Sequence, residues 1–212
     1  MNAPEPVTDT RCHYRSGDTP RSRCVSDVVL AGRIELPPLP ARLQAGWARE
    51  IREEFDLHVG DVEPLPLARA RTRWPDFRLC VAEAGHWLAS QGLPAASIGP
   101  DNIALMACLG ADRHHDGVRY GGAAFFNLFV SDDRGLDLHF PAIGLRLPLV
   151  RGTAVVFDTC QPHAVFPRGS AGFDERDFVA DRDWAQYFLT WELPIEEPAL
   201  AAALRIDFDV QA

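Results

Sequence analysis

The stretch "NIALMACLGADRHHDG", residues 102–117, joins an apolar run to two histidines and an aspartate that stand directly before a glycine. The apolar part has the composition of a buried β-strand. Residues two apart in a strand point to the same face, so His114 and Asp116 are expected to project together while His115 points away. The stretch therefore predicts a strand that ends by presenting one imidazole beside one carboxylate.

Short apolar or alternating runs continue from this stretch to the end of the core, separated by Gly, Pro, Asp and Asn. They recur about every ten residues, and no segment of helix length separates one from the next, which favours an all-β sandwich or barrel. The runs are "AAFFNLFVS" (123–131), "LDLHF" (136–140), "GLRLPLV" (144–150), "TAVVFDT" (153–159), "HAVFP" (163–167) and "QYFLTWELP" (186–194).

The segment before residue 100 has a different pattern. Residues 28–36 are β-like, and the proline-rich "PPLP" after them leads into a predicted helix over 41–58, whose apolar residues recur every four positions. A second helix is predicted over 74–92, with Gly92 just past its end. We therefore expect a mainly β protein with N-terminal helices packed outside the sandwich.

The chain divides by composition into an arm and one domain. Residues 1–27 are polar and lack an apolar period, so they are predicted to be a disordered arm. Residues 28–212 are predicted to form a single catalytic domain. Within it, 28–99 form a helical support region, 100–195 the β core, and 196–212 a C-terminal extension with a short helix.

The net charge of the chain limits the classes of partner that it can bind. With 212 residues and a formal net charge of -9, it lacks the clustered cations of a phosphate-binding surface, so a nucleic acid partner is not expected. All 21 basic residues are arginine, so a side-chain cation that holds an anion must be a guanidinium. No run of the length of a membrane helix and no secretion signal is visible, so we expect a cytoplasmic protein without a membrane partner. No sequence pattern indicates the oligomeric state.

The five cysteines are odd in number and widely spaced, which is not the pattern of a disulfide framework. Cys80 and Cys108 lie in apolar patterns and are predicted to be small core residues. Cys12, Cys24 and His13 could hold a metal in principle, but scattered ligands in a polar tail are a weak pattern.

A second imidazole follows later in the chain. In "GTAVVFDTCQPHAV", residues 152–165, a glycine-led strand is followed by a short polar turn, and His163 opens the next strand. Together with His114 and Asp116 it could complete a set of two histidines and one carboxylate on one face of a metal. This set is the facial triad of non-heme Fe(II) oxygenases, which leaves coordination positions open.

At this point the sequence resembles the Fe(II)/2-oxoglutarate-dependent dioxygenases, in particular their prolyl-hydroxylase-like branch. The resemblance covers about residues 100–195 and is carried by "HHD" (114–116), "RGLDLHF" (134–140), "GTAVVFDTCQPHAV" (152–165) and "YFLTWEL" (187–193). It implies a double-stranded β-helix, the jelly-roll or cupin-like arrangement. It also implies His114, Asp116 and His163 as ligands of Fe(II), with 2-oxoglutarate and dioxygen as co-substrates. The expected reaction is hydroxylation of a small molecule or of an amino-acid or peptide side chain.

The resemblance also requires a basic residue at the start of the last core strand, to hold the far carboxylate of 2-oxoglutarate. The sequence departs from this pattern, because "DWAQ" (183–186) stands there. Arg182 is the nearest candidate and Arg176 the next, since arginine suits a carboxylate. Arg168 and Arg146 are further alternatives.

Four other residues are candidate contacts in the cavity. Asn127 on the strand after the metal loop could hydrogen-bond an acid inside the barrel. Arg119 and Tyr120 lie in a glycine-flanked loop of the kind that often recognises substrate, and His139 lies on an alternating strand. These three are predicted substrate contacts, and a solvated loop or face is the alternative for each.

Two other functions stay open from the sequence. One is a cupin-type metalloenzyme that does not use 2-oxoglutarate, and the missing anchor is its best argument. The other is a non-catalytic β-sandwich binding module in which the histidines and the aspartate are structural.

Overall fold

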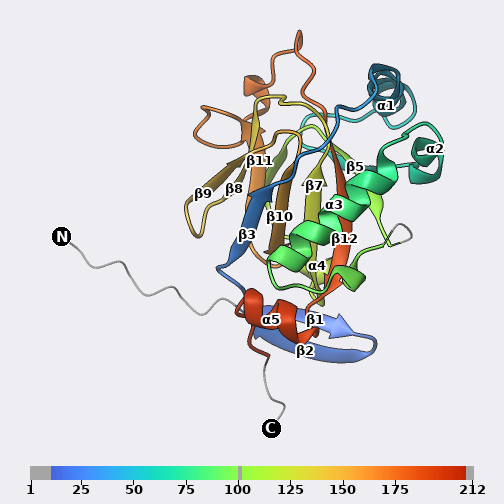
Figure 1. Cartoon of the computed structure of the whole chain (residues 1–212). Coiled ribbons are helices and arrows are strands. Elements are labelled where there is room, and N and C mark those ends of the chain that lie inside the picture. The colour runs from blue at the N-terminus through green and yellow to red at the C-terminus, as the bar shows by residue number, and fades with distance from the viewer. Residues whose placement is uncertain (1–10, 100–101, 209–212) are drawn as a thin grey trace.

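The computed structural model describes residues 11–99 and 102–208, and its core is a set of eight strands paired first with last (Figure 1). β5 pairs with β12, β6 with β11, β7 with β10 and β8 with β9, all antiparallel. This is one long antiparallel hairpin rolled up on itself, so the predicted jelly roll is confirmed. The strands are β5 (Ala104–Cys108), β6 (Ala111–His114), β7 (Ala123–Phe129), β8 (Leu136–Phe140), β9 (Leu145–Pro148), β10 (Thr153–Asp158), β11 (His163–Pro167) and β12 (Gln186–Pro194).

The rolled hairpin forms two sheets that face each other. The larger has the order β3-β10-β7-β12-β5-β4, with β3 (Val29–Arg33) and β4 (Val62–Leu65) added at its edges, and the smaller has the order β6-β11-β8-β9. Alternation sorts the side chains of β12 between its two faces. Tyr187, Leu189 and Trp191 belong to the core under the helices, whereas Phe188 belongs to the core between the sheets.

Helices cover the outer face of the larger sheet, as Figure 1 shows for α3 across β7 and β12. Trp87 on α3 stacks on Phe126, with ring centroids 5.4 Å apart, and Trp47 on α1 lies 5.0 Å from Tyr187. The two predicted helices are thus confirmed as α1 and α3, whereas β4 and the short α2 between them were not predicted. The helices are α1 (Ala41–Glu53), α2 (Leu67–Arg71), α3 (Phe77–Ser90), α4 (Gly117–Tyr120) and α5 (Pro198–Ala203), with 3-10 turns at Ala95–Ser97 and Glu175–Asp177.

The N-terminal segment is not the disordered arm that its composition predicts, at least from residue 11 onward. β1 (Arg11–Ser16) and β2 (Thr19–Cys24) form a hairpin that lies against the base of the jelly roll (Figure 1). The prediction failed because β1 buries just two side chains, Cys12 and Tyr14, and the other bonds that order the hairpin are polar or covalent. Residues 1–10 of the predicted arm lie outside the described residues.

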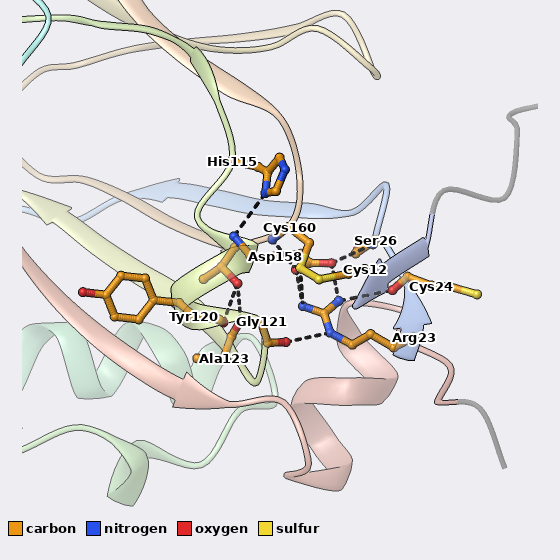
Figure 2. Close-up of a disulfide and its surroundings, with 12 residues drawn as sticks. Cys12, Arg23, Cys24, Ser26, His115, Tyr120, Gly121, Ala123, Asp158 and Cys160 are labelled. Carbon is orange, nitrogen blue, oxygen red and sulfur yellow. Dashed lines mark hydrogen bonds and ion pairs between the residues drawn. A yellow bond between two sulfur atoms is a disulfide. The ribbon is translucent and has the colours of Figure 1, made fainter. Parts of the chain in front are cut away.

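A buried ion pair joins the hairpin to the core. Arg23 donates to both carboxylate oxygens of Asp158 at the end of β10, at 2.6 Å each, and both side chains are fully buried (Figure 2). Its Nε also donates to the carbonyl of Gly121, 2.9 Å away. Asp158 accepts in addition from the backbone N–H groups of Ser26 and Cys160. Every oxygen and nitrogen of the pair therefore has a partner, which is the condition under which a buried ion pair is tolerated.

A disulfide joins Cys12 in the hairpin to Cys160 in the turn after β10, across 148 residues of sequence (Figure 2). The odd number and wide spacing of the cysteines did not predict this bond. Cys80 and Cys108 are buried, as predicted, and burial raises the pKa of each thiol to about 12. Disulfides are rare in the reducing cytosol, so this bond argues against the predicted cytoplasmic location. In the described part of the chain, no helix has the length and apolar character needed to cross a membrane.

We expect Arg23→Met to lower the free energy of unfolding by about 3–5 kcal/mol, because it leaves the Asp158 carboxylate buried without its cation. Urea denaturation measures the change. Arg21→Ala, at an exposed arginine in the same strand, is the matched control and should stay within about 0.5 kcal/mol of the wild type. Equal small losses in both variants would contradict a role for the buried pair.

Candidate metal centre

Three side chains from two strand ends and a helix cap converge at one end of the jelly roll. His114 ends β6 and His163 opens β11, and the antiparallel register places them directly opposite each other. Asp116 is the N-cap residue of α4. The Asp116 carboxylate lies 3.6 Å from Nε2 of His163 and 3.9 Å from Nε2 of His114, and one ligand atom from each residue lies within 4.8 Å of the other two. The sequence predicted this grouping correctly.

Hydrogen bonds fix the tautomer of both imidazoles. Nδ1 of His114 lies 2.7 Å from the carbonyl oxygen of Asp112, and Nδ1 of His163 lies 3.0 Å from that of Gln161. A carbonyl only accepts, so each Nδ1 carries a proton, and the neutral form of each ring has its lone pair on Nε2. Metal-ligating histidines are oriented in this way in known metal sites. Both lone pairs are therefore available on the side where the Asp116 carboxylate lies.

Burial sets the charge states of the group. His163 is 6% exposed and packs against Phe157, with ring centroids 4.9 Å apart. This desolvation, with a smaller contribution from His114, lowers the pKa of His163 to about 4, so the ring is neutral at pH 7. Desolvation also raises the pKa of Asp116, and the neighbouring His114 and His115 oppose that shift. A cation among these three groups would relieve the cost of the buried carboxylate.

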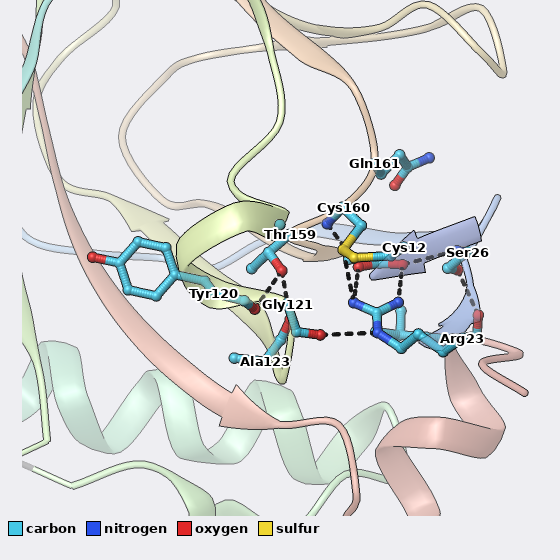
Figure 3. Close-up of polar contacts among 12 residues, drawn as sticks. Cys12, Arg23, Ser26, Tyr120, Gly121, Ala123, Thr159, Cys160 and Gln161 are labelled. Carbon is cyan, nitrogen blue, oxygen red and sulfur yellow. Dashed lines mark hydrogen bonds and ion pairs between the residues drawn. A yellow bond between two sulfur atoms is a disulfide. The ribbon is translucent and has the colours of Figure 1, made fainter. Parts of the chain in front are cut away.

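The loop that carries Asp116 is bonded to the turn that carries His163. The Asp116 N–H donates to the carbonyl of Thr159, 2.7 Å away. The Thr159 hydroxyl lies between the carbonyls of Tyr120 and Ala123, at 2.7 and 2.8 Å (Figure 3). At Gly117 an added Cβ would meet the Cys160 sulfur at 2.5 Å, so only glycine fits there. The disulfide, the buried ion pair and these bonds thus hold the ligand loops together.

A cavity of about 620 Å³ opens beside the three side chains, between the two sheets. Paired residues of β7 and β12 mark levels along it: Phe125 faces Glu192, Asn127 faces Thr190, and Phe129 faces Phe188. Both members of each pair line the cavity. Other lining residues are mainly apolar: Met106, Cys108, Ala111, Leu138, Phe157 and Val165. A larger hollow of about 780 Å³ between α1 and α2 contains none of the three candidate ligands, so the candidate site is the inner cavity.

Several other predicted site residues also lie at this cavity. Arg119 and Tyr120 line it on α4, and the Arg119 guanidinium lies over the Tyr120 ring, 5.0 Å from its centroid. Asn127 lines it deeper inside and is 7% exposed. The exposed His115 lies at the cavity wall but outside the group of three, as predicted. The sequence missed Glu63 and Glu192 as lining residues, because each lies in a run read only as strand or connection.

The structure places three other predicted residues away from the cavity. Arg182 stacks over Trp184 and donates to the carbonyl of Arg134, and the highly exposed Arg176 pairs with Asp174. Both belong to the insertion between β11 and β12, and neither lines the cavity. His139 is absent from the lining as well, because its strand neighbours Leu138 and Phe140 point inward and the pleat turns His139 outward, against Phe166. The predicted roles of Arg182, Arg176 and His139 in the site are therefore wrong.

The three side chains fit a metal ion, but the start of the last strand lacks the basic residue that would bind the far carboxylate of 2-oxoglutarate. Gln186 stands at the start of the last strand, fully buried, where its amide accepts from the Ser131 hydroxyl and donates to the carbonyl of Leu149. Over residues 11–99 and 102–208, Arg119 is the only basic side chain, histidines aside, that lines the cavity, and it lies at the metal end. The basic anchor that the resemblance requires at the last strand is therefore absent from the described lining of the inner cavity, and the use of 2-oxoglutarate stays a prediction.

No protein-family model and no curated protein matches this chain. Among solved structures it is similar to a prolyl-4-hydroxylase from Pseudomonas putida, with 18% identity and a TM-score of 0.42 over 78% of this chain and 92% of that one. It is also similar to AviO1 from Streptomyces viridochromogenes Tue57, with 16% identity and a TM-score of 0.44 over 79% of this chain and 90% of that one. Neither likeness identifies a function, and the fold assignment depends on the strand pairing of this chain.

We expect His163→Ala to weaken the binding of divalent transition metals by more than the roughly 10- to 100-fold that loss of an outer hydrogen-bond partner costs. Titration of the metal-free protein with Mn(II) or Fe(II) under argon measures the affinity. His115→Ala is the matched control, since that ring is next to the group but outside it, and it should bind as the wild type does. Equal affinities in all three proteins would mean that the three side chains hold no metal.

The pKa of His163 predicts a pH dependence for the metal-free protein. The unfolded chain takes up a proton near pH 6.5, whereas the folded chain takes it up only near pH 4. Stability from this residue is therefore fully present above pH 6.5 and is lost as the pH falls toward 4, by on the order of 3 kcal/mol.

Urea denaturation of the metal-free protein at several pH values measures this slope. His163→Gln cannot titrate and should show a shallower fall over the same window. The raised pKa of Asp116 acts in both proteins with the opposite sign, so their difference isolates His163. Identical slopes would contradict the assignment.

Proposed function

We propose that the protein is a non-heme iron(II) oxygenase in which His114, Asp116 and His163 hold the metal. One observation carries the proposal: two Nε2 atoms and a carboxylate meet beside a cavity at the open end of a jelly roll. Two histidines and one carboxylate are the ligand set of non-heme Fe(II) oxygenases, since they leave positions open for other ligands. Bound Fe(II) would supply the activation of dioxygen for the oxidation of an organic substrate.

The residues of the chain have separate roles in this proposal. The carbonyls of Asp112 and Gln161 orient the two imidazoles, and burial keeps His163 neutral so that its Nε2 is free to bind. Asp116 supplies the negative charge that offsets part of the charge of a divalent cation. The apolar walls exclude water from the space beside the group. The cavity volume is in the range of small-molecule sites, so a small molecule or a single amino-acid or peptide side chain is the proposed substrate.

The missing anchor favours an enzyme whose organic substrate binds directly at the metal, without 2-oxoglutarate. This is the cupin-type alternative, and it keeps the same three ligands. The second alternative, a binding module with structural histidines, predicts that no metal binds. Iron binding by the wild type therefore separates that module from both kinds of enzyme.

Nitric oxide tests the proposal without knowledge of the substrate, because it binds Fe(II) at a coordination position open to dioxygen. The protein is loaded with one equivalent of Fe(II) under argon, exposed to nitric oxide and examined by EPR spectroscopy. The wild type and His115→Ala should both give the half-integer-spin signal of an iron–nitrosyl complex. His163→Ala and Asp116→Ala should give at most the signal of free iron. Absence of bound iron in the wild type, or an equal protein-bound signal in His163→Ala, would overturn the proposal.

A further inference from the structure

We infer that the cavity binds a singly charged organic acid whose body is neutral, with an apolar chain and a hydrogen-bonding group at the level of Asn127. This inference rests on the proposed metal site and names the class of ligand that the site takes. It excludes a dicarboxylate such as 2-oxoglutarate as the preferred ligand. Four features of the cavity carry it: its metal end, its middle level, its floor and the acid at its edge.

The metal end of the cavity suits an anionic head group. Phe157 lies against the His163 ring and pairs in register with Phe125, so the Phe125 level is the one nearest the metal group. Arg119 lies on α4, three residues after Asp116, and its backbone N–H donates to the Asp116 carbonyl. In the described structure this guanidinium has a ring contact with Tyr120 but no carboxylate partner. A carboxylate that binds beside the metal group would have Arg119 within the same end of the cavity.

The middle level contains one neutral amide, the side chain of Asn127. It is 7% exposed, and in the described structure its Oδ1 makes no hydrogen bond. A buried polar atom without a partner costs free energy, and a ligand that hydrogen-bonds the amide recovers part of that cost. Its register neighbour on β12 is Thr190, which also lines the cavity. The Asn127 level, one pleat or about 7 Å along the strand from Phe125, therefore selects a neutral polar group on the ligand.

The floor of the cavity is apolar. The next level contains Phe129 and Phe188, whose rings are 5.0 Å apart, and Leu138 and Val165 line the cavity from the other sheet. Beyond it, Gln186 is fully committed to Ser131 and Leu149, so it offers nothing to a ligand. A charge placed at this floor would lose its water without gaining a partner, which is strongly unfavourable.

An acid lies at the edge of the cavity. The exposed Glu192 lies at the Phe125 level. Histidines aside, Arg119 is the one cationic side chain among the described residues that line the cavity, and it also lies at the metal end. The cavity therefore offers a cation to one carboxylate and none to a second charge at the inner end of the ligand.

Three 2-oxo acids that differ only in the groups on C5 test the inference. 2-Oxoglutarate ends in a carboxylate, its 5-methyl ester ends in a neutral hydrogen-bonding group, and 5-methyl-2-oxohexanoate ends in two methyl groups. Each is titrated under argon into the protein loaded with Fe(II), and the visible absorption of the 2-oxo acid chelate on iron reports binding. We expect the ester to bind best, and 2-oxoglutarate to bind at least about tenfold more weakly than the ester, because its second charge has no partner.

Two variants test which residue binds which part of the ligand. Asn127→Leu should weaken binding of the ester by about fivefold, the value of one hydrogen bond, and should leave 5-methyl-2-oxohexanoate bound equally or more tightly. Arg119→Met should weaken all three acids by a similar factor, because Arg119 contacts the head group that they share. Arg113→Met on the exposed end of β6, outside the cavity lining, is the matched control and should change none of them.

The outcomes separate this inference from the proposed function. No iron–nitrosyl complex in the wild type means that the metal site itself is wrong. An iron–nitrosyl complex together with 2-oxoglutarate binding as tightly as the ester overturns the inference alone. Loss of only 2-oxoglutarate binding in Arg119→Met would also overturn it, since Arg119 would then be the missing anchor. Iron that binds none of the three acids overturns it as well.

Discussion

The antiparallel register of β6 and β11 is the constraint on which the candidate site depends. It places His114 opposite His163, so two imidazoles far apart in sequence face each other with ring centroids 4.4 Å apart. The side-chain period of a strand is two, so a slip of one residue would exchange His114 with His115 and turn the ring away from the cavity. The pairing becomes irregular between His163 and Val165, just past this point. The site thus lies at the end pair of β6 and β11, next to an irregularity in their pairing.

The buried charges at the base of the jelly roll explain how such a register is held at a strand end. Strand ends are where pairing usually loosens, yet the turn after β10 is bonded to the N-terminal hairpin and to the Asp116 loop. The Arg23 and Asp158 side chains are buried and fully hydrogen-bonded. A movement of the turn would separate the two buried charges, which is strongly destabilising. Rigid support of this kind keeps ligand side chains close to one geometry. The hairpin therefore contributes to the metal centre without touching it.

The sequence predicted the parts of this structure that depend on local periodicity. Alternating runs with turn residues between them predicted the core strands, and the four-residue apolar stripe through Leu43 and Trp47 predicted α1. His114, Asp116 and His163 could be chosen because each stands where a strand meets a turn. The hairpin and its disulfide could not be predicted, since the partners of Cys12 and Arg23 are Cys160 and Asp158, more than half the chain away. No local pattern records such pairing.

The co-substrate is harder to predict than the metal ligands, because a metal motif and a cavity carry different information. The motif concerns only the first ligands of the metal, whereas the cavity beyond them is lined by side chains of β7 and β12. All basic residues of the chain are arginine, yet the candidates near the last strand are used elsewhere: Arg182 on Trp184 and Arg176 on Asp174. Their orientation follows from how an irregular insertion folds, which strand alternation does not determine. A shared metal triad is thus evidence for shared metal chemistry, and the rest of the reaction has to be argued from the walls of the cavity.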